Sequence, residues 1–201
     1  MPIFLDDQPV DLPGESLGAA LDAAGKRLHA SRRLIVEVQF NGELIPGDQL
    51  PRQRAQALGD HELRLYSADP RELAVDAIRQ ARLLLSQASS AQIEAADLLQ
   101  QDDPAQALER IGLAMGAWQQ AQQAVLSGSL LVDLDLDSLT FDDIPVATIV
   151  DDLLTQVKQL KQLITDKDTL ALADVLAYEW PATTDRWDQL MAHLADTIEE
   201  S

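Results

Sequence analysis

Short apolar segments alternate with turn residues along the first third of the chain. Apolar stretches at 2–5 and 9–12 flank the polar residues Asp6-Asp7-Gln8, which predicts a hairpin. After Pro13-Gly14 the apolar residues recur at helical spacing, which predicts one face of a helix that ends near Ala30. The residues on that face are Leu17, Leu21, Ala24 and Leu28.

The apolar period then changes from 3.6 residues to two. Residues 34–40 are rich in β-branched and apolar side chains, which predicts a strand. One face of this strand is expected to carry Val36, Val38 and Phe40. Asn41-Gly42 is the pair that best tolerates the positive φ angles of a tight hairpin turn, so a short returning strand is expected at 43–45. An irregular stretch leads to a last strand at 62–66.

The order of these elements is a hairpin, a helix, a strand, a tight turn, a short strand and a final strand. This order resembles that of ubiquitin and its structural relatives over residues 2–67, and the resemblance implies a β-grasp domain at 1–68. Ubiquitin-type modifiers end in a free diglycine tail, whereas this chain runs from Tyr66 through Ser67-Ala68-Asp69 into a new helix. Conjugation to other proteins is therefore not expected.

Residues 69–201 carry the apolar spacing of helices. Asp69-Pro70-Arg71-Glu72 combines an N-cap acceptor, a proline at the first helical position and a capping glutamate, and Asp103-Pro104 repeats this signal. A third helix is expected from Pro145, and the last segment should break or kink at Pro181 because proline removes a helix hydrogen bond. Four amphipathic stretches favour an up-down antiparallel bundle, so the fold class is α+β. The second helix is expected to face the core with Leu108, Ile111, Met115, Trp118 and Val125.

Residues 127–144 are predicted to form a long loop within the bundle, since they exceed the usual length of a connection. Aspartates alternate with leucines here, and three aspartates at alternate positions are typical of the opening of a calcium-binding loop. Counted from Asp133, however, Ser138 stands where that loop needs glycine and Ile144 stands where it needs glutamate. An extended strand with docked leucines and solvated aspartates is the favoured interpretation.

Charge is unevenly distributed between the two parts. The chain of 201 residues has 15 basic and 34 acidic side chains, a net charge of −19, and a pI near 4.2. Residues 1–68 contain 7 basic and 10 acidic side chains, whereas residues 69–201 contain 8 and 24, which places a domain boundary near 67–69. A field of this sign opposes contact with phosphate backbones and anionic lipid, so no binding to nucleic acid or to a membrane is expected.

The cellular compartment follows from what the sequence lacks. Cysteine is absent, which fits a reducing compartment. The chain opens without a positively charged, apolar leader, and no apolar run reaches the length needed to span a bilayer. A cytoplasmic, soluble protein is therefore expected.

The residue types that carry catalysis or bind metals do not form a motif. The three histidines, His29, His61 and His193, lack a second histidine at i+4, and no phosphate-binding glycine loop or nucleophile elbow is present. Carboxylate pairs such as Asp102/Asp103 and Asp151/Asp152 flank helix starts, where they complement the helix dipole. We therefore predict no catalytic residue, no cofactor and no metal site, and expect a protein that is not an enzyme.

Aromatic residues are few, and several gather near the end of the chain. Tyr178 and Trp180 precede Pro181, with Trp187 two turns later, and aromatic side chains are the usual anchors of interfaces. These three residues and Trp118 are predicted to bind a partner; the alternative is that the tryptophans seal the bundle beside a kink. The glutamine-rich residues after Trp118 form an uncharged helix face, which suits a helix interface or solvent.

The absence of catalytic motifs, together with two architectures that bind other chains, predicts a non-enzymatic adaptor or chaperone that holds another polypeptide. In composition and helix layout the second part is similar to bacterial flagellar and type III export chaperones. One alternative is a nucleic-acid mimic whose carboxylates imitate phosphates and occupy a DNA-binding protein. A second alternative is a carboxylate-metal hydrolase.

Overall fold

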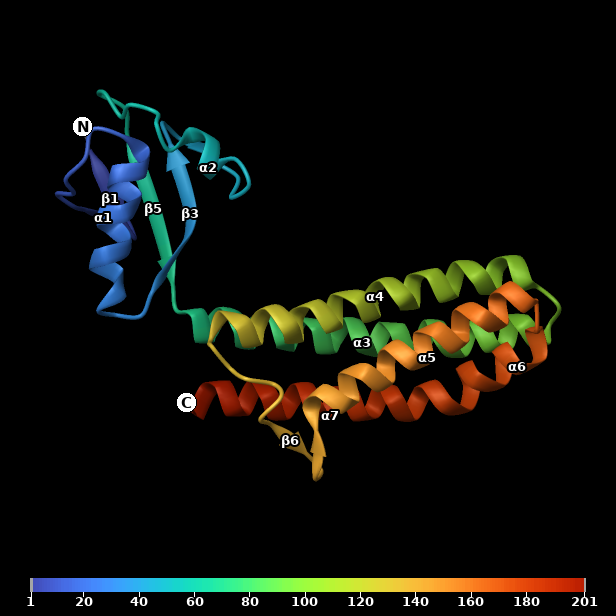
Figure 1. Ribbon diagram of the computed structural model, residues 1–201. Helices are drawn as coiled ribbons and strands as arrows, with labels where there is room; N and C mark the ends of the chain where they lie inside the picture. The colour runs from blue at the N-terminus through green and yellow to red at the C-terminus, as the bar shows by residue number, and fades with distance from the viewer. Residues whose placement is uncertain (1, 201) are drawn as a thin grey trace. The chain divides into compact units, whose positions relative to one another are not determined.

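The computed structural model describes residues 2–200 and has an α+β fold with a small mixed sheet and a helical bundle (Figure 1). The chain divides into two compact units, the first ending at Glu72 and the second beginning at Leu73. The sequence placed a boundary near 67–69, a few residues earlier. Each unit has its own hydrophobic core.

The first unit is a five-stranded sheet with two helices. Its strands are β1 (Ile3–Leu5), β2 (Gln8–Pro9), β3 (Leu34–Phe40), β4 (Glu43–Leu44) and β5 (Leu63–Ala68). They lie in the order β2-β1-β5-β3-β4, with β1 and β5 parallel and the other neighbours antiparallel. The helices are α1 (Leu17–His29) and α2 (Leu50–Gln53), and α2 replaces part of the stretch expected to be irregular.

Two tight turns lie where the sequence predicts hairpins, although β2 (Gln8–Pro9) is shorter than the stretch expected at 9–12, and a helix cap begins α1. Asp6 and Asp7 both have positive φ angles, as do Asn41 and Gly42, so each pair closes a two-residue hairpin. The Ser16 hydroxyl accepts a hydrogen bond from the backbone N–H of Ala19 at 3.3 Å, which caps α1. These local interactions fix where the strands and the helix begin.

Strand β3 does not carry the expected single apolar face. Ile35 pairs with Ser67 and Glu37 pairs with Tyr66, so Val36 is the extra residue of a β-bulge. The bulge reverses the alternation, and Val36 is 49% exposed while Val38 is buried. The prediction of one face with Val36, Val38 and Phe40 was therefore wrong at its first residue.

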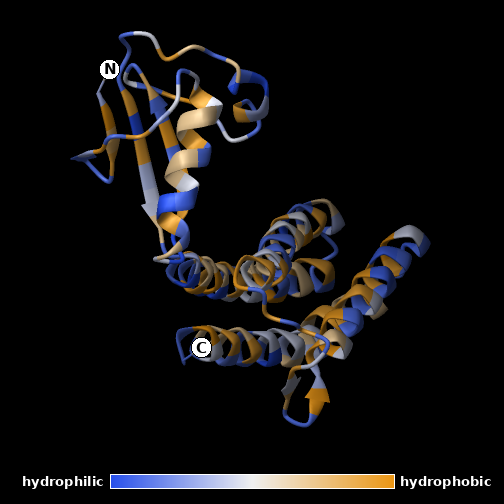
Figure 2. Ribbon diagram, turned by 60° about the vertical axis from the view of Figure 1, so that its left-hand side comes forward, coloured by the Kyte–Doolittle hydropathy of each residue, from blue (hydrophilic) through white to orange (hydrophobic). Residues whose placement is uncertain are grey.

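The core of this unit lies between α1 and one face of the sheet. Leu17, Ala24 and Leu28 of α1 are buried, as predicted, and they pack in one cluster with Leu63 and Leu65 of β5. Figure 2 shows the hydrophobic residues along the strands and on the facing side of α1. The apolar pattern of the sequence thus decided which side of α1 and of β5 became buried.

The second unit consists mainly of long helices that run side by side (Figure 1). They are α3 (Pro70–Gln100), α4 (Pro104–Leu131), α5 (Val146–Asp166), α6 (Thr169–Asp174), the π-helix η1 (Val175–Glu179) and α7 (Trp180–Glu200). The pairs Glu94–Arg110 and Arg79–Glu199 make α4 and α7 antiparallel to α3, as an up-down bundle requires. The expected caps also form, since Asp69 and Asp103 each accept a backbone N–H of the following turn.

Helices α3 and α4 meet through small side chains that repeat every seven residues. The buried residues are Ala74, Ala81, Ala88 and Ala95 on α3, and Ala107, Ala114, Ala121 and Gly128 on α4. Small side chains at this period let two helices approach closely along a continuous seam. A Cβ placed on Gly128 would lie 3.6 Å from the Cβ of Ala74, which is ordinary van der Waals contact.

This seam corrects the predicted core of α4. Ile111, Trp118 and Val125 are buried as expected, and Met115 is half-buried. Leu108 is 45% exposed because its neighbour Ala107 takes the core position. The prediction favoured large apolar residues, whereas alanines form much of the contact between α3 and α4.

The connection after α4 is much shorter than the long loop predicted at 127–144. Helix α4 continues to Leu131, and the last residues form a hairpin of β6 (Thr140–Phe141) and β7 (Ile144–Pro145). Asp142 and Asp143 make its turn with positive φ angles. An aspartate pair can therefore close a hairpin as Asn-Gly does, a signal that the sequence prediction passed over at this position.

The chain does not break at Pro181. It lies in the first turn of α7, directly after η1, and the N–H of Trp180 bonds to the carbonyl of Val175, five residues earlier. A proline in a helix leaves a carbonyl without its partner and crowds the preceding turn, and a π-helical turn accommodates this. In place of the predicted break or kink, the structure has a π-helical turn that leads directly into α7. Among the helices of residues 2–200, none is both long enough and apolar enough to cross a bilayer.

Candidate binding surfaces of the helical unit

The three tryptophans predicted to bind a partner lie in the core. Trp118, Trp180 and Trp187 are at most 2% exposed. Trp118 makes edge-to-face contacts with Trp180 and Trp187, with ring centroids 5.4 and 5.6 Å apart. This arrangement joins α4 to α7, as the alternative interpretation proposed, and leaves no indole face on the surface for a partner.

Tyr178 is the one predicted partner-binding residue that lies on the surface, where it is 75% exposed. The π-helical turn carries Tyr178 outward while the adjacent residues of η1, Val175 and Leu176, are buried. A single exposed tyrosine is ordinary on a protein surface and does not define a site.

An uncharged surface covers parts of α3 and α4. No charged residue occurs at 83–93 on α3 or at 111–132 in and just after α4, in a chain of which 24% is charged. The exposed side chains of these segments include Leu83, Leu113 and Leu130, which are 69%, 62% and 79% exposed. The glutamine-rich face noted in the sequence is part of this surface.

A groove of about 520 Å³ runs along this surface between the two helices. Its walls come from Leu84, Gln87 and Ala91 of α3 and from Gly112, Leu113, Gly116, Ala117 and Gln120 of α4. The Glu94–Arg110 ion pair, at 3.2 Å, closes one end. We call this the α3–α4 groove.

Gly112 and Gly116 have no packing role within the chain. A Cβ added to either would meet no atom within 4 Å, and both lie in the interior of α4. Glycine in a helix interior is about 1 kcal/mol less favourable than alanine. Since these glycines line the α3–α4 groove, their effect is to keep the groove open.

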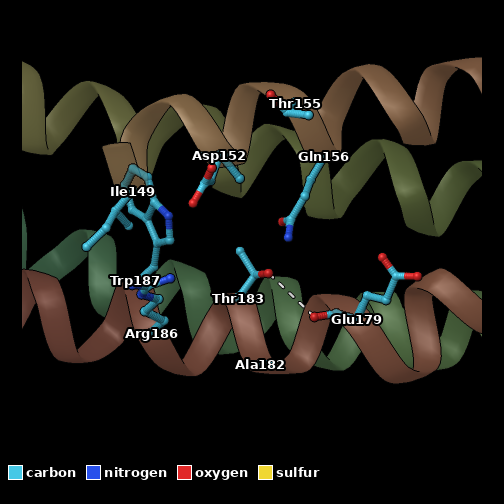
Figure 3. Close-up of a pocket in the computed structure, with 10 residues that line it drawn as sticks. Ile149, Asp152, Thr155, Gln156, Glu179, Ala182, Thr183, Arg186 and Trp187 are labelled. Carbon is cyan, nitrogen blue, oxygen red and sulfur yellow. Dashed lines mark hydrogen bonds between the residues drawn. The ribbon is translucent and has the colours of Figure 1, made fainter. Parts of the chain in front are cut away.

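A second groove, of about 470 Å³, lies between α5 and the η1–α7 segment. Figure 3 shows Asp152 and Gln156 reaching from α5 toward Thr183 of α7, with Ile149 and Trp187 at one side. Glu179 and Arg186 also line it. We call this the α5–α7 groove.

Several buried polar atoms near these helices have no hydrogen-bond partner in the described part of the chain. They are Nε2 of Gln92, Oε1 of Gln156 and Nε1 of Trp118, Trp180 and Trp187. A buried polar group without a partner costs about 1–3 kcal/mol. Of these five atoms, two belong to residues that line the α5–α7 groove, Gln156 and Trp187, although the atoms themselves are not exposed to solvent.

A second ion pair, besides Arg79–Glu199, joins α3 to α7. Arg82 donates two hydrogen bonds to the two carboxylate oxygens of Asp188, each at 2.8 Å. These hydrogen bonds lower the pKa of Asp188 below its usual value, against the opposing effect of burial. The pair therefore favours the ionised carboxylate.

Five exposed aspartates follow the uncharged surface, at 133, 135, 137, 142 and 143. Leu134 and Leu136 between them pack against the core, as predicted, although the backbone forms turns and not the expected strand. Across residues 2–200 the His, Asp and Glu side chains form no group of three or more that could hold a metal ion. His61 and His193 instead contact the rings of Phe40 and Phe141.

Each groove lies between two helices, and its walls come from residues of both. The uncharged run of 111–132 was visible in the sequence, and counting charges along α4 would have revealed its full length. The α5–α7 groove left no such signal, because its walls come from residues about 30 positions apart. Comparison of the chain with protein-family models, curated proteins and solved structures finds no match.

Proposed function

We propose that this protein is a non-enzymatic adaptor that binds another polypeptide in the α3–α4 groove, and that its first unit is a β-grasp domain. The observation that carries the proposal is the uncharged surface with exposed leucines on an otherwise strongly acidic helical unit. Charged residues are depleted in the cores of protein interfaces, because their desolvation opposes association.

The strand order supports the β-grasp assignment. A parallel pair, β1 and β5, lies between two antiparallel hairpin partners, and α1 packs on one face. The chain passes from Ala68 at the end of β5 to Pro70 at the start of α3, so the last strand has no free tail. This connection favours a docking module over a modifier that is conjugated to other proteins.

The shape of the α3–α4 groove favours a helical partner segment. Gly112 and Gly116 lie one turn apart on the same side of α4, and with neither bearing a side chain a second helix can approach closely. The exposed Leu113 and the half-buried Leu84 offer apolar contacts for residues spaced at i, i+3 or i+4, and i+7. The expected partner is therefore an amphipathic helix whose apolar face enters the groove.

Replacement of Leu113 by aspartate tests this proposal. Leu113→Asp places a charge on the rim of the groove, where a bound helix would have to desolvate it, and should lower partner recovery about tenfold. The measurement is quantitative pull-down from native lysate, with wild-type and variant proteins at equal concentration.

Leu170→Asp is the matched control, because Leu170 is also exposed, at 74% against 62% for Leu113, but does not line the α3–α4 groove. A polypeptide that is lost with Leu113→Asp and retained with Leu170→Asp supports the proposal. Equal recovery with both variants, or no protein recovered above background, would contradict it.

The aspartates at 133–143 favour one second candidate, a nucleic-acid mimic that occupies a DNA-binding protein. All five are exposed, and no basic residue lies between them. Binding that depends on such carboxylates weakens steeply with salt, by orders of magnitude between about 50 and 200 mM. Binding in the α3–α4 groove, where Glu94 and Arg110 are paired with each other, should change little over the same range, so a salt titration separates the two candidates.

A further inference from the structure

The α5–α7 groove has opposite hydrogen-bonding character at its two ends. Donors lie at one end, where Arg186 and the indole Nε1 of Trp187 line the wall. Acceptors lie at the other end, with Gln156 and Glu179, while Asp152 and Thr183 stand between (Figure 3). Within residues 2–200, Arg186 forms no ion pair with either carboxylate of the groove.

Two of these groups are buried and unsatisfied. The Trp187 side chain is 1% exposed, and its Nε1 has no acceptor in the described part of the chain. Oε1 of Gln156 is likewise buried without a donor. A groove that presents a lone donor and a lone acceptor is complementary to a ligand that supplies one of each.

We propose that the α5–α7 groove binds a short zwitterionic peptide of about three residues. Its carboxylate accepts hydrogen bonds from Trp187 and Arg186, and its ammonium donates to Gln156 and Glu179. Every polar group that lines the two ends then has a partner. The arrangement also accounts for a guanidinium and a carboxylate at opposite ends of the groove, since Arg186 serves one end of the ligand and Glu179 the other.

The length of the groove selects the size of the peptide. Glu179 and Trp187 are eight residues apart in the chain, which corresponds to about 12 Å along a helix. An extended tripeptide spans about 10 Å between its termini. A free amino acid is too short to reach both ends. This site is separate from the α3–α4 groove, so its failure would leave the proposed adaptor function untouched.

Calorimetric titration of the full chain with trialanine tests the proposal directly. Trialanine should bind, and N-acetyl-trialanine and trialanine amide, which lack the ammonium and the carboxylate respectively, should each bind about tenfold more weakly. Equal affinity for the three peptides, or no binding of trialanine at millimolar concentration, would overturn it.

Variants then assign each end of the peptide. Arg186→Gln should weaken trialanine about tenfold and remove its advantage over trialanine amide, because both changes delete the same interaction. Glu179→Gln should likewise weaken trialanine about tenfold and remove its advantage over N-acetyl-trialanine, because both changes delete the contact with the ammonium.

The matched controls are Lys158→Gln on α5 and Asp185→Asn on α7, which change the same charges at exposed positions outside the groove. They should alter affinity by less than about twofold. Circular dichroism establishes that each variant folds. An equal loss with the controls would show a general charge effect and overturn the assignment of the ends.

Discussion

The two helix pairs of the second unit differ in how they meet and in what they expose. Helices α3 and α4 meet through a seam of alanines, and the groove outside that seam is uncharged along most of its length. Helices α5 and α7 leave a groove lined by two carboxylates, a guanidinium and two unsatisfied polar atoms. The first pair is suited to an apolar helix, and the second to a small ligand with charged ends.

The difference shows that net charge describes neither surface. A net charge of −19 predicts repulsion from anions everywhere, yet α4 presents more than five turns without a charge. The carboxylates are concentrated in the 133–143 connection and along α5 to α7. The positions of the charged residues, and not the net charge of the chain, decide which partners each surface can bind.

The tryptophan cluster holds the two pairs together, and its removal should have the largest effect on stability. Trp118→Ala deletes both edge-to-face contacts and leaves a cavity between α4 and α7. We expect a loss of about 3–5 kcal/mol in the free energy of unfolding, measured by chemical denaturation. Tyr178→Ala, at the exposed aromatic position, should change it by less than about 0.5 kcal/mol. A small effect of Trp118→Ala would show that the pairs are joined elsewhere.

Much of the first unit could be predicted because its signals are local. Asn41-Gly42, the helix face from Leu17 to Leu28 and the strand at 34–40 all depend on neighbouring residues. The bulge at Val36 could not be predicted from neighbouring residues, because it depends on how β3 pairs with β5. In the second unit the helix starts were predicted from their caps, whereas the burial of Trp180 and Trp187 depends on Trp118 some 60 residues earlier. Each groove likewise depends on how two helices pack against each other.

Substitution of Gly112 and Gly116 should have opposite effects on the stability of the protein and on its binding of a partner. Gly112→Ala and Gly116→Ala together should raise the free energy of unfolding by about 1–2 kcal/mol, since alanine favours the helix and meets no atom within 4 Å. The same change fills the α3–α4 groove and should lower partner recovery.

Gly25→Ala is the matched control for the glycine pair. Gly25 lies in the interior of α1, and an added Cβ there also meets nothing within 4 Å. This variant should gain stability in the first unit and keep full partner recovery. If the double glycine variant binds its partner as well as the wild type does, the groove is not the docking site.

The smallest expected effect concerns Arg82–Asp188, one of the two ion pairs that link α3 to α7 in residues 2–200. Because the pKa of Asp188 is lowered in the folded protein, its contribution is present above the unfolded value of about 3.9 and is lost as pH falls through the folded value. Asp188→Asn should therefore cost at most about 1 kcal/mol near pH 7, since both side chains are partly exposed, and the cost should shrink below about pH 4. Denaturation at several pH values measures this difference.

Asp185→Asn is the control. It removes a neighbouring carboxylate that forms no ion pair in residues 2–200, and it should change the free energy of unfolding by less than about 0.5 kcal/mol. A loss for Asp188→Asn that stays constant from pH 7 to pH 3 would mean that helix packing, and not the ionised pair, holds α7 against α3.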